Sequence, residues 1–479
     1  MIKVEFKTLL AAAFLAAPAA ATDFDGLPSV KELAGQAKSA EVSVPAPSAP
    51  RDARAVKDWT IMVFMNGKNN LSEYVVKDMN EMEKVGPTDN INIVTQAARM
   101  KYTPPSHGGG GYDDYPDYPG YPGWHPGLPG GFHQLPPMLN KATRDAGTDW
   151  TGVRRYLVTK DGDNAALSST MLQDLGSVDM GDWKQLAEFG KWVKANYPAK
   201  KYLLIVWNHG SGWEMRGPRP VIRGISYDDE TGHGINPVDL AAAVRGMGGV
   251  DIYASDACLM QMAEVDYELK DAAKIIVGSE ETEPGDGWAY DFFLSRVESN
   301  KNNLTPEVMA AAAVQGYKAY YAGVGTAVTQ SALRTSGLAG FRALLDQWAA
   351  LVMKEDKAMV KEAMNAAVGF EGAGSRDLIH FLKNVHAGAK SPALRAKTPE
   401  VMNYFYKKVF IDNGASGDKF KEASGLAVYL PGWSFDENYN KLAWARDGQW
   451  PALVKWLTAK DETPAAAAAN SHAMEGNGL

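Results

Sequence analysis

A histidine and a cysteine each follow an apolar segment of this sequence. In proteins with parallel sheets, catalytic side chains often lie directly after such strands. The apolar run 201–207 leads into the tripeptide NHG, which contains His209, and the run 250–254 leads into SDAC, which ends at Cys258. Ligands of open parallel sheets bind at the carboxyl ends of the strands. Taken singly, Cys258 could be an inert core thiol and His209 a histidine that bonds to a loop. Together they predict nucleophilic catalysis, because a thiol reacts as its thiolate and an imidazole can accept the proton.

The segments around these motifs alternate between strand and helix patterns. Continuous apolar runs indicate strands buried on both faces, and apolar residues at helical spacing indicate helices. Strands are predicted at 60–65, 91–94, 154–158, 201–207, 250–254 and 274–278, and helices at 71–85, 238–247, 259–269 and after Asp182. This alternation predicts an α/β fold with a mostly parallel sheet covered on both faces. Cys258 would then directly precede a helix, whose N-terminus favours a thiolate.

The composition limits the class of protein. The chain has 479 residues, of which 45% are apolar and 22% charged, and these proportions are ordinary for a globular protein. The formal net charge of -8 argues against a nucleic-acid partner, because such proteins usually carry a basic surface. A single cysteine, Cys258, excludes an intramolecular disulfide and a zinc ribbon.

The N-terminus has the pattern of an export signal. Lys3 and Lys7 precede the apolar run 9–17, and an alanine-rich cleavage site ends at Ala21. The prediction is a signal peptide at 1–21 and an exported protein, periplasmic or extracellular; an uncleaved N-terminal anchor is the alternative. No other apolar stretch has the roughly 18 residues of a membrane span. The segment 22–57, rich in Ala, Pro and Ser, is expected to be a flexible leader or pro-segment.

The rest of the chain divides by composition. The α/β domain is expected at 58–300, interrupted at 102–137 by a low-complexity insertion of Tyr, Pro and Gly. That insertion is expected to be a solvated surface loop, with binding of metal or carbohydrate as the alternative. After residue 300 the pattern becomes more helical, so we expect a smaller helix-rich subdomain at 301–460 and a disordered tail at 461–479.

The two motifs, LLIVWNHGSGW and VDIYASDACLM, resemble those of the clostripain-like cysteine peptidases, in the clan that includes caspases, legumains, gingipains and separases. The segments WTIMVFMNGKNNL, GSEETEPGDGWAY and SGLAVYLPGW are similar to that family as well. The resemblance covers roughly residues 59–100 and 150–457. It implies a caspase-like three-layer α/β/α sandwich and an endopeptidase that acts on polypeptides as a monomer and requires no cofactor.

The resemblance also implies the roles of the site residues. Cys258 would be the nucleophile and His209 the general acid and base of a Cys–His dyad, and the reaction would pass through a thioester acyl-enzyme. The backbone N–H groups of Gly210 and Cys258 would form the oxyanion hole. Glycine suits that position because its backbone can approach a substrate closely.

The resemblance further implies cleavage after Arg, and to a lesser degree after Lys. Asp256 would be the acid of the S1 pocket, with a helix cap as its alternative, and Asp286 a second acid, with a solvated turn as its alternative. The nearby Glu280, Glu281 and Glu283 are expected to form a solvated acidic run. Two tryptophans could wall the cleft or pack in the core, namely Trp213 and Trp288.

Some relatives cut themselves at basic residues, and this chain offers candidate sites. Arg216, Arg219 and Arg223 lie in a Gly- and Pro-containing loop after His209, and Lys101 adjoins the insertion. Because some relatives use calcium, the acidic turns 228–230 and 161–164 are candidate calcium ligands, with solvated turns as the alternative.

Two other readings stay open from the residues alone. A metal-assisted hydrolase could use His209, His233 and either Asp228 or Asp229, although the spacing does not match a common zinc motif. A catalytically inactive interaction protein could use the Tyr/Pro/Gly insertion as its contact surface.

Overall fold

The fold is built around one large sheet. The structure is a computed structural model, and it describes residues 56–101, 149–162, 166–213, 224–372 and 374–460. Nine strands of this part form a sheet in the order β12-β10-β9-β8-β5-β1-β2-β3-β4. Their bounds are β1 Lys57–Gly67, β2 Ile91–Arg99, β3 Gly152–Leu157, β4 Thr170–Gly176, β5 Ala199–Trp207, β8 Val250–Asp256, β9 Ala273–Gly278, β10 Ser331–Arg334 and β12 Phe410–Asn413.

The centre of the sheet is parallel and its margins are antiparallel. β9, β8, β5, β1 and β2 pair in parallel, whereas β3 and β4 on one side and β10 and β12 on the other pair antiparallel. The central strands are the continuous apolar runs of the sequence, and strands buried on both faces favour this position. The parallel sheet that the sequence predicts corresponds to the central five strands of the nine-stranded sheet.

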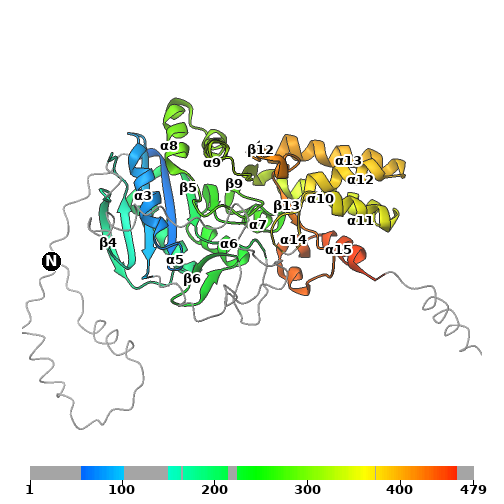
Figure 1. Cartoon of the computed structure of the whole chain (residues 1–479), viewed down its shortest axis with the longest axis horizontal. Helices are drawn as coiled ribbons and strands as arrows, with labels where there is room; N and C mark the ends of the chain where they lie inside the picture. The colour runs from blue at the N-terminus through cyan, green and yellow to red at the C-terminus, as the bar shows by residue number, and fades with distance from the viewer. Residues whose placement is uncertain (1–55, 102–148, 163–165, 214–223, 373, 461–479) are drawn as a thin grey trace, which may run out of the picture. The chain divides into compact units, whose positions relative to one another are not determined.

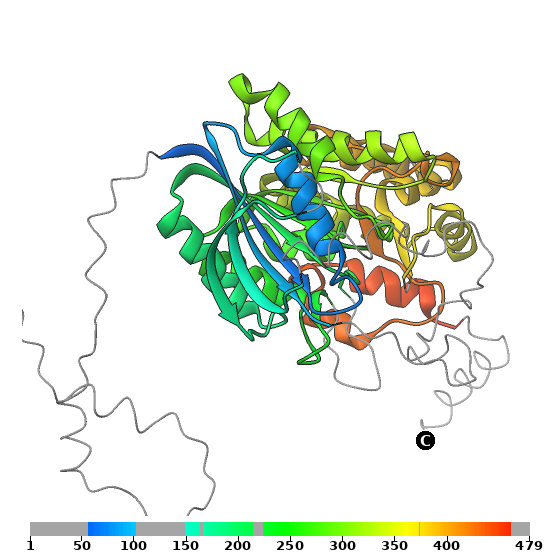
Figure 2. The same cartoon turned by 60° about the vertical axis from the view of Figure 1, so that its left-hand side comes forward.

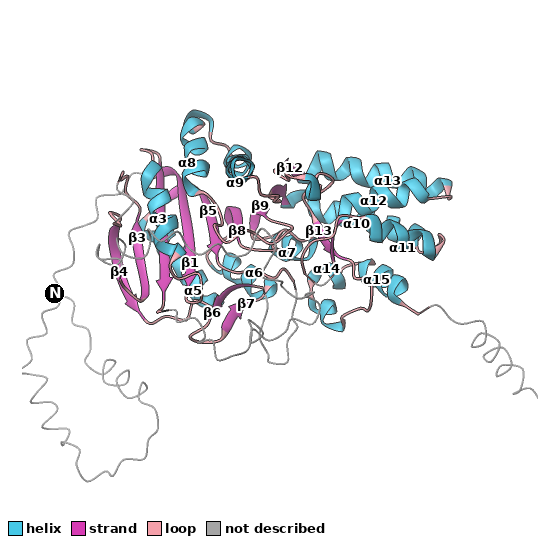
Figure 3. Cartoon of the chain, viewed as in Figure 1, coloured by secondary structure: helices cyan, strands magenta, loops and turns pink. Residues whose placement is uncertain are grey.

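Helices cover both faces of the sheet, as Figures 1 and 3 show. On one face, α5 (Trp183–Asn196), α6 (Pro237–Gly246) and α7 (Ala263–Leu269) pack against strand residues such as Phe64 and Leu204. On the other, α3 (Tyr74–Val85), α8 (Tyr290–Ser299) and α9 (Pro306–Val324) pack against residues such as Val63 and Ile205. In Figure 2, α3 lies in front of the strands. Successive residues of one strand point to opposite faces, and the result is the predicted three-layer α/β/α sandwich.

Local sequence signals set the ends of several helices. At the start of α6, the side chain of Asn236 accepts a hydrogen bond from the N–H of Asp239, and Pro237 occupies the first turn. At the start of α9, Thr305 caps Val308 N–H in the same way. The predicted helix 259–269 is shorter than expected, because α7 begins only at Ala263.

The region after residue 300 contributes to the main sheet as well as to a helical layer. β10 and β12 extend the sheet, and Figure 1 shows helices α10 to α13 gathered beyond that edge. A small sheet of β11 (Ser375–Asp377) and β13 (Ala427–Tyr429) lies in the same region. The helices of this C-terminal region are α10 Leu338–Val352, α11 Lys357–Ala366, α12 Leu378–Gly388, α13 Pro392–Tyr404, α14 Ala443–Arg446 and α15 Trp450–Thr458.

Several sequence-based predictions fall outside the described residues. They are the signal peptide, almost all of the leader, the low-complexity insertion and the tail. Within the described part, no helix combines the length and the apolar character needed to cross a membrane.

Candidate active site

The topology of the sheet brings His209 and Cys258 to the same edge. β5 and β8 are parallel neighbours with Trp207 opposite Asp256, and the N–H of Asn208 donates to the Asp256 carbonyl at 3.2 Å. His209 and Cys258 therefore leave adjacent strands side by side, at the carboxyl edge where parallel sheets place their ligands.

Gly210 lies directly against the cysteine. A Cβ added to Gly210 would collide with the Cys258 carbonyl oxygen and would lie 3.1 Å from the side chain of Ala257. Only glycine permits this approach without a shift of the turn. The backbone N–H of Gly210 favours negative charge on the Cys258 sulfur and so acts to lower the pKa of the thiol.

The histidine is held by an asparagine that the sequence analysis did not single out. Nε2 of His209 lies 2.7 Å from Oδ1 of Asn70. An amide oxygen can only accept, so Nε2 donates in this arrangement and Nδ1 is the basic nitrogen. Asn70 follows β1, the parallel neighbour of β5. A search for polar residues after every central strand would have found it.

Burial keeps both members of the pair neutral in this state. It raises the pKa of the Cys258 thiol to about 12, with the nearby Glu283 carboxyl as a further cause. It lowers the pKa of His209 to about 4. The thiol donates towards the Glu283 carbonyl at 3.9 Å. These two shifts favour the neutral thiol and the neutral imidazole over a thiolate–imidazolium pair.

The helix N-terminus that the sequence predicts next to Cys258 does not lie there. Cys258 lies in a turn that precedes α7, and the first residue of that helix is Ala263. In this turn Leu259 has a φ of 62°, a strained conformation for a residue with a Cβ. Backbone bonds from Leu259 N to Glu281 O at 3.1 Å and from Gln261 N to Ser279 O at 2.9 Å hold the turn. The turn thus follows from tertiary contacts that helical periodicity does not reveal.

Asp256 lies two residues before Cys258, at the end of β8, and is 4% exposed. Its Oδ1 accepts from the N–H of Trp288 at 3.1 Å and its Oδ2 from the hydroxyl of Tyr290 at 2.8 Å. Burial raises the pKa of Asp256 to about 6. A Cβ at Gly287 would lie 2.9 Å from Oδ1, so the loop after β9 closes tightly over this carboxyl group.

Asp286 occupies a different environment. Its side chain is 50% exposed, and Oδ1 forms an ion pair with Nζ of Lys77 at 3.3 Å. Lys77 also contacts Asp78 at 3.6 Å and Glu81 at 3.2 Å. Of the two carboxyl groups expected in the S1 pocket, Asp256 is inside the protein and Asp286 is at its surface beside a cation.

The prediction of a solvated acidic run was wrong. Glu280 is 1% exposed and accepts from Gly425 N at 3.2 Å, while Glu281 is buried and pairs with Lys419 at 3.0 Å. The carboxyl oxygens of Glu283 are buried too. The segment after β9 turns inward against the C-terminal region, a long-range contact that composition alone does not predict.

The two tryptophans pack in the core. Trp213 meets Tyr429 and Tyr439 edge-on, with ring centroids 4.6 and 4.9 Å apart. Trp288 packs against Phe293 at 5.7 Å. Of the two alternatives left open by the sequence, core packing applies to both.

The residues proposed for the alternative of a metal-assisted hydrolase do not form a common site. Nδ1 of His233 lies 2.6 Å from Asp179, and the Asp228 carboxylate accepts backbone bonds from Met180, Glu230 and Thr231. Among the described residues, no three His, Cys, Asp or Glu side chains are grouped to hold a metal ion. The turn 161–164 is described only in part.

The candidate cleavage sites are only partly visible. Arg216, Arg219 and Arg223 lie outside the described residues, whereas Lys101 is described and exposed.

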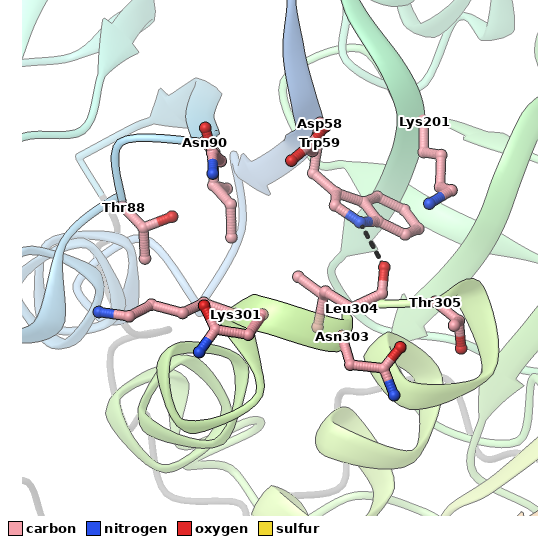
Figure 4. A pocket seen from close by; sticks show the side chains of 11 residues that line it. Asp58, Trp59, Thr88, Asn90, Lys201, Lys301, Asn303, Leu304 and Thr305 are labelled. Atoms are coloured by element: carbon pink, nitrogen blue, oxygen red, sulfur yellow. Dashed lines mark hydrogen bonds between the residues drawn. The ribbon is translucent and has the colours of Figure 1, made fainter.

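A separate surface pocket lies at the opposite edge of the sheet (Figure 4). Trp59 and Lys201, near the amino ends of β1 and β5, line it together with the segment 301–305. Nε1 of Trp59 donates to the Leu304 carbonyl at 3.0 Å. This pocket contains neither Cys258 nor His209.

A cysteine and a histidine at the carboxyl edge of an α/β/α sandwich define the class of caspase-like cysteine peptidases. The sequence profile of the Clostripain family matches residues 63–412. The chain belongs to the clostripain family and is a cysteine-type endopeptidase.

Known proteins agree with this assignment. Clostripain from Hathewaya histolytica is 24% identical over 488 residues, which cover 83% of this chain and 84% of that protein. A secreted C11 cysteine protease from Bacteroides thetaiotaomicron, solved with an irreversible peptide inhibitor, superposes with a TM-score of 0.56 at 17% identity and covers 82% of this chain and 99% of its own. An inactive zymogen C11 protease from Parabacteroides distasonis gives 0.54 at 16% identity, with 82% and 98% covered. The predicted caspase-like fold is confirmed.

Proposed function

We propose that this protein is an exported endopeptidase that cleaves polypeptides after Arg, and less readily after Lys, through the dyad of Cys258 and His209. The observation that carries this proposal is the meeting of His209, Gly210 and Cys258 at the ends of two adjacent parallel strands.

The reaction would proceed in two halves. Nδ1 of His209 takes the thiol proton while the sulfur of Cys258 bonds to the substrate carbonyl carbon. The imidazolium then protonates the leaving amine, the C–N bond breaks, and a thioester remains. In the second half His209 takes a proton from a water molecule whose oxygen attacks the thioester carbon. The C–S bond then breaks, the carboxylic acid product leaves, and the imidazolium returns its proton to the sulfur of Cys258.

The developing oxyanion would be stabilised by the N–H groups of Gly210 and Cys258. Gly210 lies directly against Cys258, and its N–H favours negative charge at the sulfur, which supports a role as a donor to an oxyanion on the adjacent carbon. Loss of one such donor typically lowers kcat about 10²- to 10³-fold.

Basic specificity is supported by Asp256, a buried carboxyl group two residues before the nucleophile. A guanidinium can bind a carboxylate through two parallel hydrogen bonds, which an ammonium cannot do. This difference supports a preference for Arg over Lys.

Export and self-processing complete the proposal. The signal-peptide pattern at 1–21 supports export, and a structural relative is named as a secreted protease. Arg216, Arg219, Arg223 and Lys101 are the candidate self-cleavage sites. We expect catalysis to need no cofactor, although calcium could still bind, and comparison of activity in EGTA and in calcium tests this.

The experiment is hydrolysis of matched fluorogenic peptides that end in Arg, Lys, Ala or Asp, under reducing conditions, by wild type and by Cys258→Ala. The expected result is Arg-selective cleavage that the substitution abolishes. Undiminished activity of Cys258→Ala would overturn the thiol mechanism, and equal cleavage of the Ala peptide would overturn the basic specificity. Intact mass followed over the same incubation tests self-processing.

A further inference from the structure

We propose that the buried carboxyl groups of Glu280 and Asp377 share one proton, and that this carboxyl pair positions the turn that carries Cys258. The inference rests on the proposed function, because Cys258 is the nucleophile proposed there. Neither Glu280 nor Asp377 belongs to the dyad or to the proposed S1 pocket, so both would act through the nucleophile and not on the substrate.

Glu280 and Asp377 come from distant parts of the chain and meet inside the protein. Glu280 follows β9, whereas Asp377 is the last residue of β11 and caps the N-terminus of α12. Their side chains are hydrogen-bonded to each other. The two residues are 1% and 0% exposed, so water does not screen the contact between their carboxyl groups.

The other contacts of the two side chains show where the proton lies. Oδ1 of Asp377 accepts from the N–H of His380 at 2.6 Å, and Oδ2 accepts from the N–H of Ser424. Oε2 of Glu280 accepts from the N–H of Gly425 at 3.2 Å, and Oε1 receives no N–H group from the described residues. Because a carboxylate can only accept, a hydrogen bond between two carboxyl groups requires a proton, and Oε1 of Glu280 is the oxygen placed to carry it.

The electrostatic environment agrees with this placement of the proton. Burial, followed by the charge of Asp377, raises the pKa of Glu280 well above its usual range. Burial also raises the pKa of Asp377, but its two backbone N–H partners and the bond to Glu280 act to lower it. Two carboxylates in contact repel each other, so loss of the shared proton would push the pair apart.

The backbone around Glu280 connects the carboxyl pair to the nucleophile. The carbonyl groups of the residues on either side of Glu280 accept from the N–H groups of Gln261 and Leu259, at 2.9 and 3.1 Å. Leu259 directly follows Cys258 and has a φ of 62°, a conformation that persists only where surrounding contacts support it. A displacement of Glu280 would therefore relax the turn and move the sulfur.

The Asp377 side of the carboxyl pair holds the C-terminal region against the same turn. Ser424 and Gly425, which donate to the pair, lie shortly before β13. The first residue of β13, Ala427, donates its N–H to the carbonyl of Gln261 at 3.1 Å. The turn is thus held between two segments, and the carboxyl pair bonds to both of them.

Two further titratable groups act on the carboxyl pair among the described residues. They are His380, in the first turn of α12, and Glu281, the neighbour of Glu280. Nδ1 of His380 accepts from the N–H of Val368 at 3.1 Å, and Glu281 forms an ion pair with Lys419 at 3.0 Å. A substitution of Glu280 leaves all these groups in the protein, so a comparison with wild type isolates the shared proton.

Denaturant unfolding between about pH 5 and 9 tests the shared proton. Glu280 ionises at its ordinary pKa in the unfolded chain but keeps its proton in the fold, so stability falls as pH rises until the folded protein ionises as well. We expect the unfolding equilibrium constant of wild type to rise about tenfold per pH unit relative to that of Glu280→Gln, whose amide donates to Asp377 without ionising. Equal slopes in these two proteins would overturn the shared proton.

Glu264→Gln is the matched control for this measurement. It makes the same substitution at another buried acid, which bonds to Tyr429 and Tyr439 and not to the carboxyl pair. Burial raises the pKa of Glu264 to about 7, so its own contribution changes only up to that pH. Above about pH 7, Glu264→Gln should therefore keep the slope of wild type.

Hydrolysis of an Arg peptide tests the positioning role. Glu280→Met keeps the size of the side chain but leaves Asp377 without the shared proton, so we expect kcat to fall at least about tenfold while KM changes less than about twofold. Glu280→Gln should restore kcat to within about threefold of wild type. Between about pH 7 and 10, kcat of wild type should fall relative to that of Glu280→Gln, a comparison that needs no apolar variant. Wild-type kcat in Glu280→Met, or coinciding pH profiles of wild type and Glu280→Gln, would overturn the positioning role.

These two measurements separate failure of the carboxyl pair from failure of the proposed function. Unfolding needs no substrate, so it decides on the shared proton even if wild type cleaves no Arg peptide and the proposed function fails. If wild type and Glu280→Met cleave the Arg peptide at the same rate, only the positioning role fails.

Discussion

The two edges of the same parallel strands differ in how they treat polar groups. At the amino edge, Asp58 and Lys200 form an ion pair at 2.8 Å between exposed side chains. At the carboxyl edge, Asp256 and Glu283 have buried carboxyl groups and Cys258 and His209 have pKa values shifted by burial. Shifted protonation equilibria cluster where chemistry occurs, which supports the active site proposed at the carboxyl edge, whereas the pocket of Figure 4 lies at the amino edge.

The two edges also differ in how many groups they hold that lower the stability of the folded state. Exposed ion pairs cost little and contribute little, whereas buried carboxyl groups and a strained Leu259 require support from surrounding structure. Substitutions at the two edges should therefore have very different consequences, and the predictions below proceed from the largest expected effect to the smallest.

Gly210→Ala should give the largest of these effects. The new Cβ would collide with the Cys258 carbonyl and displace the N–H proposed for the oxyanion hole, so we expect kcat to fall about 10²- to 10³-fold. Gly323→Ala in α9 is the matched control, because nothing lies within 4 Å of its added Cβ. It should keep full activity. Equal losses in the two variants would remove the special role of Gly210.

Asn70→Asp should shift the pH dependence of catalysis. A carboxylate 2.7 Å from Nε2 would stabilise the imidazolium and raise the pKa of His209 from about 4. The acid limb of the kcat/KM profile should move to higher pH, while Asn70→Ala should lower kcat about tenfold through lost orientation. An unchanged acid limb in Asn70→Asp would argue against contact between the two residues during catalysis.

Glu264 tests whether buried acids away from the dyad shape stability. Its Oε1 accepts from Tyr429 N at 2.9 Å and from the Tyr439 hydroxyl at 2.5 Å, and burial raises its pKa to about 7. Since the folded pKa exceeds the unfolded value, its contribution is fully present below about pH 4 and is lost as pH rises towards 7.

Denaturant unfolding at pH 5 and pH 7 checks this. Wild type should lose roughly 2–3 kcal/mol more than Glu264→Gln over this interval, because the amide cannot ionise and still offers an oxygen to the same donors. A parallel decline in both proteins would assign the pH dependence to other groups.

Lys200→Ala should have the smallest effect. It removes the exposed pair with Asp58 at the amino edge, and we expect neither the melting temperature nor kcat/KM to change measurably. A clear loss of activity in this variant would break the distinction between the two edges.

Sequence reasoning located the principal elements because their signals are local. The apolar runs at 201–207 and 250–254 became β5 and β8, and the rule for parallel sheets then placed His209 and Cys258 on one edge. The turn around Leu259 and the burial of Glu280 and Glu281 depend on contacts with segments far away in the chain. Asn70 and Glu280 lay in segments recognised as family-like, but their roles depend on which side chains meet after folding.

The most direct test of the account is to find where an Arg-directed affinity label attaches. Wild type, His209→Ala and Cys258→Ala would be treated with a peptidyl-Arg chloromethyl ketone, digested and examined by mass spectrometry. The account predicts a single adduct on the peptide that contains Cys258, at least about 100-fold slower in His209→Ala and absent in Cys258→Ala. An adduct on another residue, or labelling of Cys258 at the same rate without His209, would contradict it.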